Sequence, residues 1–595
     1  MTPPGLPGVY VRVSKIRRSQ IVSVFGPGSI IDTFDDSATL KGLGHWPDPR
    51  PEDRIVDERL QGSLGVDFLY QPPALDEDDP SHRLPIVKFP ASHNCPSCHR
   101  LTDDFKPGER RKDGVWCTGC KQARMTPARF VAACARGHAQ DFPFKEWAHS
   151  GRTGCGEQLF MRTLGKSAGL RDIKIDCDCG QGKTMEGAFS EGALHGVGVD
   201  CAGLFLWRGP GGSPCTSDLR ALQRGASNFY FAETMSSLSI PPWEGRIAEV
   251  VHKVRALNGG RYPDSKDPEH VIVVSVALRP QRYSGIRVED VFAWVARATE
   301  AKRQKKDQED FKVEEYGAFA GVVSSDDDWP RFSVRSVPVP LPLKGFLDQV
   351  VLADVLEEIR ALVGFRRIDP WSPESDEQPI GNQVPLREPD IRWLPGVRLT
   401  GEGIFLRFNQ ESLSAWAGQP RVESRARELQ SQIDLRVSKG KGRPFFVTPT
   451  TLLIHSFSHA LMLRLSLECG YSSGALRERV YSQGSPDGHG GSMAGLLVYT
   501  GSTDSEGTLG GLVSMGEQSP LGRFVKRAIS EAAWCSSDPI CSEVKNTGER
   551  TMNLAACHGC LFVPETSCEF YNSILDRQAL VGDLDGKSGY FTALL

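Results

Sequence analysis

The chain has 595 residues, of which 39% are hydrophobic and 24% are charged, and its 70 basic and 74 acidic residues give a formal net charge of −4. This composition is that of a globular protein of several domains, and it excludes a strongly basic nucleic-acid-binding protein, so any contact with DNA has to be a local patch. No apolar run reaches membrane-spanning length and no signal-peptide core follows Met1, which predicts a cytoplasmic protein.

Residues 1–85 are expected to form an N-terminal segment that ends in a linker. An apolar run within residues 11–34 breaks at Gly26-Pro27-Gly28, which indicates a turn. Phosphate binding at this turn is the alternative, but Pro27 removes one backbone donor and no Lys-Ser/Thr pair follows, so a structural turn is predicted. The acidic, proline-rich stretch at 71–83 is typical of a solvated linker.

Residues 86–240 are predicted to form a cysteine-rich zinc-binding domain. Its clearest unit is Cys95-Pro-Ser-Cys98, which is followed after eighteen residues by Cys117-Thr-Gly-Cys120. Two such knuckles present four thiolates, which complete a tetrahedral shell around one Zn²⁺. Disulfides are the alternative, and paired cysteines without a secretion signal favour metal over disulfides.

A second zinc site in the same domain is predicted from four further cysteines. The pair Cys177-Asp-Cys179 follows a strand-like segment, and we group it with Cys201 and Cys215 as a second tetrathiolate. The grouping stays open, because other residues of the domain could replace one ligand or build a third site. These residues are Cys134, His138, His149 and Cys155.

Residues 241–400 are expected to form an α/β middle region with charged linkers. Residues 244–257 carry apolar residues at helical spacing, and residues 346–364 predict a strongly amphipathic helix that Gly364 closes. The stretch 300–315 mixes both signs of charge, which is typical of a solvated helix or loop. A proline- and acid-rich stretch at 369–390 marks the next linker.

Residues 401–595 form the last predicted domain. A strand-like alternation follows Gly401, a charged helix is expected near 421–437, an apolar helix follows Thr448, and 496–500 is a candidate buried strand. With zinc-stapled modules near the N-terminal third and at the C-terminus, these patterns predict a multidomain α+β fold.

His455 and His459 lie four residues apart on the apolar helix, so both rings can share one face. Zinc metalloproteases use this spacing, but Ser456 stands where those enzymes carry a glutamate base. We therefore predict a packed or hydrogen-bonding helix face. The alternative is a metal-dependent nuclease or hydrolase that uses both histidines with a carboxylate such as Asp504 or Glu506.

The C-terminal cysteines predict another zinc site. Cys557-His-Gly-Cys560 forms a knuckle and Cys568 follows it, and these three cysteines are the expected core of the ligand set. Cys541 is the predicted fourth ligand, and Cys535 is the alternative. Four protein ligands leave no position for water, so the site is expected to be structural. The chain as a whole is expected to hold two or three zinc ions.

A complete phosphate-binding loop for nucleotide hydrolysis is missing from the sequence. Gly182-Lys183-Thr184 ends like a phosphate-binding loop, but Cys177 stands where the loop requires its first glycine. The sequence also has no dinucleotide-binding fingerprint. We therefore expect that the chain is not itself an enzyme.

Two sets of motifs resemble known families. The segment from His455 through the glycine-rich stretch 499–511 to Cys557, Cys560 and Cys568 resembles the zinc-binding C-terminal domain of MrfA-type superfamily 2 DNA helicases. The motifs in the N-terminal part are Arg18-Ser-Gln, Phe25-Gly-Pro-Gly-Ser and the stretch 222–228. Together with the paired cysteines, they resemble the DrmB family of the DISARM antiphage defence systems.

The resemblance implies a non-catalytic accessory subunit that works with a DrmA-like helicase. That partner would supply ATP hydrolysis, and the complex would bind and restrict phage DNA. Since the chain is nearly neutral, its own DNA contacts are expected to be local. The candidate DNA-binding residues are Arg17, Arg18, Lys439, Lys441 and Arg443.

Overall fold

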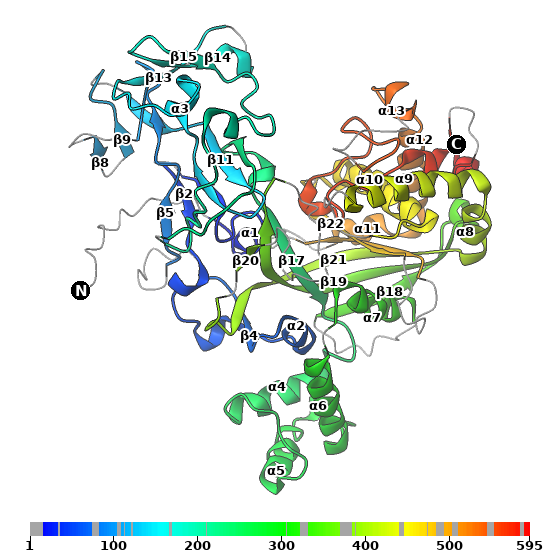
Figure 1. Cartoon of the computed structure of the whole chain (residues 1–595). Coiled ribbons are helices and arrows are strands. Elements are labelled where there is room, and N and C mark those ends of the chain that lie inside the picture. The colour runs from blue at the N-terminus through cyan, green and yellow to red at the C-terminus, as the bar shows by residue number, and fades with distance from the viewer. Residues whose placement is uncertain are drawn as a thin grey trace. The chain divides into compact units, whose positions relative to one another are not determined.

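The computed structural model in Figure 1 describes most of the chain. The described residues are 16–33, 36–73, 83–103, 109–111, 114–120, 123–165, 169–209, 211–304, 306–321, 331–368, 384–386, 388–438, 445–472, 474–482, 493–501, 510–543, 552–583 and 588–595. Most of the predicted linkers at 71–83 and 369–390 lie outside these residues.

The chain divides into two compact units that are each assembled from separate segments. The first unit comprises Met1–Ile55, Leu69–Thr234 and Ala361–Val397, and the second comprises Val56–Phe68, Met235–Arg360 and Arg398–Leu595. Four of the described strands begin in one unit and end in the other: β4 (Phe68–Tyr70), β17 (Phe231–Leu238), β19 (Leu347–Arg366) and β21 (Trp393–Phe408). The four consecutive domains predicted from the sequence stay a prediction. The two units are defined by which residues contact one another, and they do not show which segments fold on their own.

The first unit consists mainly of short antiparallel strands. The described strands form one sheet of order β15-β14-β13-β7-β6-β10-β9-β8 and two smaller sheets, β1-β2-β5 and β12-β11-β16. Its helices are α1 (Arg18–Ile21) and α3 (Phe144–Ala148). Its strands are β1 (Ile30–Asp32), β2 (Ser37–Leu40), β3 (Arg54–Ile55), β4 (Phe68–Tyr70), β5 (Ile86–Lys88), β6 (His93–Asn94), β7 (Arg100–Thr102), β8 (Arg110–Arg111), β9 (Gly114–Trp116), β10 (Arg124–Pro127), β11 (Phe130–Cys134), β12 (Ala139–Asp141), β13 (Leu159–Thr163), β14 (Ile173–Cys177), β15 (Gly182–Thr184), β16 (Leu219–Gln223) and β20 (Val384–Pro385).

Strand β14 shows how this unit buries its core. Ile173, Ile175 and Cys177 point inward and alternate with two partly exposed residues, as a half-buried strand requires. Ile175 lies in a core with Phe130 and Trp147. The strand carries Cys177 at its end, so packing of its apolar residues positions a metal ligand.

The turn at Gly26-Pro27-Gly28 has a structural role. Gly28 has a φ of +87°, and a Cβ added to it would lie 2.9 Å from the ring of Trp207. Its carbonyl oxygen accepts a hydrogen bond from Nη2 of the buried Arg367 at 2.8 Å. A left-handed backbone and this close contact both require glycine, and the turn is packed against the protein as the sequence indicates.

The second unit combines a long-stranded sheet with helices on both faces (Figure 1). Its strands follow the order β17-β19-β21-β23-β22, and β18 pairs with β19. On one face, Phe319 of α7 stacks on Phe405 at 5.1 Å between centroids, and on the other Phe457 of α10 meets Phe408 at 5.8 Å. The remaining elements of this unit are α2 (Glu58–Leu64), α4 (Arg246–Leu257), α5 (Pro268–Ala277), α6 (Val288–Arg303), α7 (Gln308–Ala320), β18 (Phe332–Val337), α8 (Gln410–Ala417), α9 (Pro420–Ser438), α10 (Pro449–Cys469), β22 (Leu476–Tyr481), β23 (Gly495–Thr500), α11 (Gly511–Met515), α12 (Gln518–Ala532), α13 (Ile540–Glu543) and α14 (Arg577–Val581).

Several predicted elements are confirmed in this unit, including the helices α4, α9 and α10 and the strands β21 and β23. The expectation of a solvated helix or loop at 300–315 is wrong in part. Lys312 of α7 is buried, and its Nζ lies 3.0 Å from a carboxylate oxygen of Glu569.

The predicted amphipathic helix at 346–364 is wrong, because this segment is strand β19. The charged residues that define a polar helix face in the sequence are buried: Glu357, Glu358 and Arg360. Nε of Arg360 lies 3.3 Å from Glu358. Although burial opposes its ionisation, Arg360 and Arg477 hold the pKa of Glu358 at about 2. A strand that is covered on both faces needs no alternation of apolar and polar residues. Its buried charged residues stand at sequence positions where an amphipathic helix would have its polar face.

Helix α10 forms the centre of the C-terminal part. The hydroxyl of Thr448 accepts a hydrogen bond from the backbone N–H of Thr451, Pro449 occupies the first turn, and Gly470 ends the helix with a φ of +69°. Most residues of α10 are buried, including both histidines. None of the described helices is long and apolar enough to cross a membrane.

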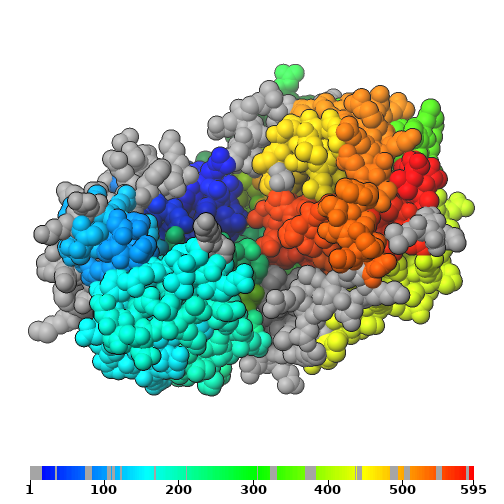
Figure 2. All heavy atoms as spheres, turned by 90° about the horizontal axis from the view of Figure 1, so that it is seen from above, coloured from blue at the N-terminus to red at the C-terminus, as the bar shows by residue number. Residues whose placement is uncertain are grey.

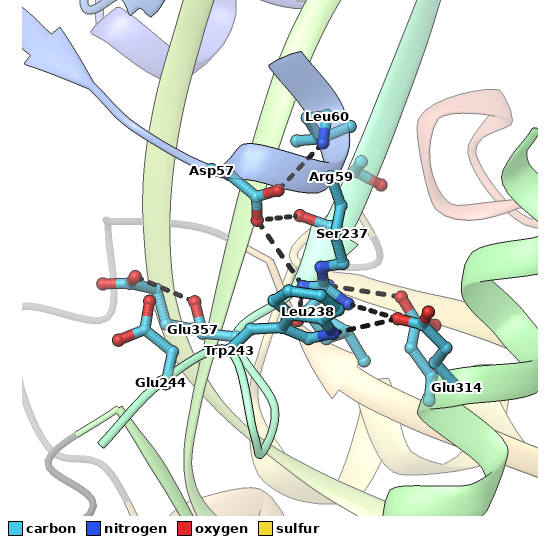
Figure 3. A network of polar contacts seen from close by, with 12 residues as sticks. Asp57, Arg59, Leu60, Ser237, Leu238, Trp243, Glu244, Glu314 and Glu357 are labelled. Atoms are coloured by element: carbon cyan, nitrogen blue, oxygen red, sulfur yellow. Dashed lines mark hydrogen bonds and ion pairs between the residues drawn. The ribbon is translucent and has the colours of Figure 1, made fainter. Parts of the chain in front are cut away.

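Helix α2 joins the second unit through the buried guanidinium of Arg59 (Figure 3). Its Nη2 donates to the carbonyl oxygen of Leu238 at 2.7 Å, and its Nη1 lies 3.2 Å from Glu314. The guanidinium also lies 5.5 Å from the ring centroid of Trp243, whose Nε1 donates to Glu314. One side chain therefore connects an N-terminal helix with two distant parts of the sequence.

Replacing Arg59 with methionine should lower the free energy of unfolding by about 3 kcal/mol, because the buried carboxylate of Asp57, the partly buried carboxylate of Glu314 and the carbonyl of Leu238 each lose a partner. Denaturant unfolding monitored by tryptophan fluorescence measures the change. Arg282→Met is the control, since Arg282 is 55% exposed in its ion pair with Glu249 and should cost less than about 1 kcal/mol. Equal effects of both variants would contradict this role of Arg59.

Candidate metal centres

Metal-ligating side chains gather in five groups within the described part of the chain. In each group the ligand atoms lie within 4.8 Å of one another, and every cysteine except Cys469 belongs to one of the groups. Four groups are rich in thiols: Cys95, Cys98, Cys117 and Cys120; Cys134, His138, Cys201 and Cys215; His149, Cys155, Cys177 and Cys179; and Cys535, Cys541, Cys557 and Cys560. The fifth group is His455, His459, Glu478 and Cys568.

The first quartet is grouped as the sequence predicts. The turn between β6 and β7 carries Cys95 and Cys98, and the turn between β9 and β10 carries Cys117 and Cys120. The Sγ atoms of Cys95 and Cys120 lie 3.6 Å apart, as do those of Cys98 and Cys117. Ligands of a tetrahedral Zn²⁺ with Zn–S bonds of about 2.3 Å lie about 3.8 Å apart, whereas disulfide sulfurs lie about 2.05 Å apart. The spacing therefore fits zinc.

The second thiol-rich group is built around the hairpin of β11 and β12. Gly137, with a φ of +87°, turns the chain so that Cys134 and His138 lie side by side, with 3.4 Å between Sγ and Nδ1. Cys215 approaches the same hairpin, since its Sγ lies 3.9 Å from that of Cys134. Cys201 completes the group.

The third thiol-rich group lies at the turn between β14 and β15. This turn carries Cys177 and Cys179, and the Sγ of Cys155 lies 3.7 Å from that of Cys177. His149 follows α3, and its Nδ1 donates to the carbonyl oxygen of Lys145 at 2.7 Å. Its Nε2 then carries the lone pair and lies 3.3 Å from Sγ of Cys179. A histidine whose other nitrogen is held by a carbonyl is the usual arrangement of a metal ligand.

The predicted grouping of Cys177, Cys179, Cys201 and Cys215 is therefore wrong. The structure places the first two with His149 and Cys155, and the last two with the β11–β12 hairpin. Both groups use a histidine that the prediction kept only as an alternative. The sequence signal that could have found the hairpin pair is Cys134-Ala-Arg-Gly-His138, because a glycine in a tight turn brings the two ligands together.

The C-terminal quartet contains Cys557 and Cys560 as predicted, but its other ligands are Cys535 and Cys541 together. The Sγ of Cys557 lies 3.4 Å from that of Cys535, and the Sγ of Cys560 lies 3.8 Å from that of Cys541. Cys568, which we expected in this set, belongs to the fifth group. Cys568 is close to the Cys557–Cys560 knuckle in sequence, but its side chain faces His455 on helix α10. The predicted ligand set is therefore corrected.

Buried or partly buried arginines accompany three of the thiol-rich groups. Arg100 lies within hydrogen-bonding reach of the Cys117 thiol, and Arg577 within reach of the Cys541 thiol. Arg367 donates from Nε to the carbonyl oxygen of Gly137 at 2.9 Å, inside the Cys134–His138 turn. A zinc ion with three or four thiolates carries excess negative charge, which a guanidinium in this position offsets.

Two of the thiols ionise readily in their groups. A hydrogen bond from the Cys201 thiol lowers the pKa of Cys134 to about 5, with a further contribution from His138. A hydrogen bond from the Cys560 thiol lowers the pKa of Cys541 to about 6. Thiolates are the form that binds zinc, so both groups offer an anionic ligand at neutral pH.

His455 and His459 lie on one face of α10, as their spacing indicates, and they form the fifth group together with Glu478 and Cys568. Both side chains are buried, and their rings lie 4.5 Å apart between centroids. Asp504 and Glu506, the carboxylates named for a hydrolase, lie outside the described residues. A buried histidine pair is closed to a substrate as large as DNA, so the geometry does not favour the nuclease alternative.

The candidate DNA-binding residues are only partly described. Arg17 is exposed and Arg18 half-buried at the beginning of α1. Lys439, Lys441 and Arg443 lie outside the described residues. DNA binding by these residues stays a prediction.

Comparison with known proteins places these groups in a family. Residues 457–561, which contain the C-terminal quartet, match the MrfA Zn-binding domain, so the quartet lies in a known class of zinc-binding domain. Residues 17–231 match a domain of unknown function (DUF8724). The chain is 31% identical to the DISARM protein DrmB of Bacillus paralicheniformis over 589 residues, which is 95% of this chain and 100% of that protein. The chain therefore belongs to the DrmB family of the DISARM antiphage system.

Proposed function

We propose that this DrmB-family chain is a non-catalytic, zinc-stabilised accessory subunit of a DNA helicase complex that restricts foreign DNA. One observation carries the proposal. A domain of the class found in MrfA-type helicases lies in a chain whose sequence has no phosphate-binding loop. The zinc-binding part and the motor would then reside on separate polypeptides.

The composition of the thiol-rich groups supports a structural role for zinc. Each of the four groups supplies four protein ligands, and a zinc ion with four protein ligands has no position left for a water nucleophile. We propose one zinc ion in each, which is more than the two or three expected from the sequence. The reducing cytoplasm keeps such thiols available for metal, and we place the protein there.

The residues that most resemble a nucleotide-binding loop support the proposal that another subunit hydrolyses ATP. Gly182-Lys183-Thr184 forms strand β15, and Nζ of Lys183 lies 4.0 Å from the ring centroid of Trp147. A phosphate-binding lysine has to reach a nucleotide from a glycine-rich turn, whereas this lysine packs on an aromatic ring. ATP hydrolysis is therefore assigned to a DrmA-like helicase subunit, and DNA binding to the complex.

Co-purification with a DrmA-like helicase subunit tests the proposal. We expect a stable complex whose ATPase activity is present in the helicase subunit and missing from this chain alone. The isolated chain should also leave single- and double-stranded DNA intact in the presence of divalent metal ions. DNA binding by the complex should weaken with rising salt, because its contacts are mainly to phosphates.

The decisive control is an assay of the isolated chain without its partner. If the isolated chain cut DNA and His455→Ala abolished the cutting, the accessory role would be wrong. Failure to form any complex with the helicase subunit would also contradict it. Lys526→Ala, at an exposed position of α12, serves as a neutral variant in both assays.

A further inference from the structure

We propose that His455, His459, Glu478 and Cys568 hold a fifth zinc ion in the core of the second unit. The site goes beyond the accessory role, since it requires neither a helicase nor DNA. Its four ligands come from α10, from β22 and from the loop that follows the C-terminal quartet. All four residues are buried, with both histidines 0% exposed.

The ring orientations show that both histidines direct a lone pair into the group. Nδ1 of His455 lies 3.0 Å from the carbonyl oxygen of Ile574, and Nδ1 of His459 lies 2.8 Å from that of Leu561. A carbonyl only accepts, so each Nδ1 carries the proton and donates it. Each Nε2 of a neutral ring is then a bare acceptor, which is the form that binds a metal.

The distances between ligand atoms fit one tetrahedral ion. Nε2 of His455 lies 3.2 Å from Sγ of Cys568 and 3.2 Å from Oε1 of Glu478, and Nε2 of His459 lies 3.6 Å from the same oxygen. Zinc bonds of about 2.0–2.3 Å place nitrogen, oxygen and sulfur ligands about 3.3–3.6 Å apart. The four atoms therefore surround a space of the right size.

Hydrogen bonding alone leaves this group poorly satisfied. Nε2 of His459 and Oε2 of Glu478 are buried and have no hydrogen-bond partner among the described residues. Without a cation, two nitrogen lone pairs face a carboxylate and a sulfur atom, and buried polar atoms in that state are costly. A cation at the centre would accept both nitrogen lone pairs and would offset the negative charge of the carboxylate and the thiolate.

The surroundings of Cys568 match those of the thiol-rich groups. The backbone N–H groups of Phe570 and Asn572 both donate to its Sγ at 3.3 Å. The C-terminal quartet has the same kind of contact. There the backbone N–H of Gly559, two residues after Cys557, donates to Sγ of Cys557 at 3.3 Å. Backbone donors aimed at sulfur stabilise a thiolate, so Cys568 is prepared as a ligand in the same way.

The donor set selects the metal. Two imidazoles, one thiolate and one carboxylate suit a borderline ion such as Zn²⁺, whereas Ca²⁺ and Mg²⁺ require oxygen ligands. The site is also linked to the C-terminal quartet, because His459 donates to Leu561, the residue after the ligand Cys560. The fifth ion would therefore fasten the loop after the C-terminal quartet, which carries Cys568, to helix α10 and strand β22.

Native mass spectrometry of the full chain, purified without chelator, tests the proposal. We expect five zinc ions per chain, one for each group. Four ions in a fully folded chain would overturn the proposal. The count does not depend on complex formation, so it is separate from the test of the accessory role.

Glu478→Gln distinguishes a metal site from a hydrogen-bonded network. In a metal site the neutral amide is a poor ligand, so the variant should lose one zinc ion and melt at a lower temperature. In a network without metal, the new amide N–H donates to a ring Nε2, so the zinc count and the melting temperature would be kept, which would overturn the proposal. Cys568→Ser should lose the same single ion, and Cys469→Ser should lose none. If Glu478→Gln does not fold, the zinc count of the unmodified chain decides.

Discussion

Replacing Cys557 with serine is expected to remove one zinc ion per chain and to unfold the surroundings of the C-terminal quartet. Structural zinc binds zinc-finger peptides with about 10–16 kcal/mol of apparent free energy, whereas a folded domain is stable by about 5–15 kcal/mol. Losing the ion therefore removes a contribution comparable to the stability of the whole domain. Metal analysis measures the loss of zinc, and circular dichroism during heating measures the loss of helix.

Two further variants show whether the quartet has the ligands that the structure assigns. Cys535→Ser should reproduce the effect of Cys557→Ser, and the double variant should lose no more zinc than either single variant, because both cysteines belong to one group. Cys469→Ser, outside all five groups, is the matched control and should keep all zinc. A double variant that lost two ions would contradict the assigned ligands.

Combining Cys177→Ser with Cys201→Ser is expected to remove two zinc ions, one more than either change alone. The structure assigns these cysteines to different groups, one at the β14–β15 turn and one at the β11–β12 hairpin. Each ion holds a separate part of the same hydrophobic core, which contains both Ile175 and Cys134. The double variant should therefore unfold the first unit, whereas each single variant leaves one of the two ions to hold it. Zinc content and thermal unfolding of the three variants measure the effect.

The companion pair gives the opposite result. Cys155→Ser and Cys177→Ser affect one group, so their combination should lose a single ion and be no less stable than the more damaging single variant. If Cys177→Ser and Cys201→Ser instead removed the same ion, the tetrathiolate predicted from the sequence would be correct. The two double variants together decide how these ligands are divided.

The arginines beside the thiol groups explain how a nearly neutral chain holds several anionic centres. Arg367 is fully buried, and burial lowers its pKa to about 9. In the absence of a neighbouring anion, such a charge is costly to bury. It donates to carbonyl oxygens of Gly28 and Gly137, and the second of these lies inside a thiol-rich group. A bound zinc–thiolate centre would supply the negative charge that this arginine faces.

Local patterns in the sequence were sufficient to predict features that are formed by residues close together in the chain. The knuckles Cys95-x-x-Cys98 and Cys557-x-x-Cys560 form their ligand pairs in single turns, so spacing alone predicts them. Helix α10 is likewise predicted, because the segment after Thr448 is apolar and carries His455 and His459 at helical spacing. The family resemblance also rests on such local motifs, and the match over 95% of the chain confirms it.

The prediction failed where an interaction joins distant segments. Strand β19 has the periodicity of a helix, and only its burial on both faces, with Glu358 and Arg360 paired inside, makes it a strand. Cys568 lies eight residues after Cys560, yet it faces His455 on α10 because the chain folds back between them.

The sequence by itself determined that this protein carries paired thiols spaced for a metal ion, that it combines helices and strands, and that it belongs with the DrmB proteins. Only the tertiary structure decided which thiols lie together, and that two histidines, a glutamate and a cysteine form a separate buried group. The physical reason is that a knuckle is closed by the short chain between its cysteines. A complete coordination shell is closed only when packing of the core brings separate segments within about 4 Å of one another.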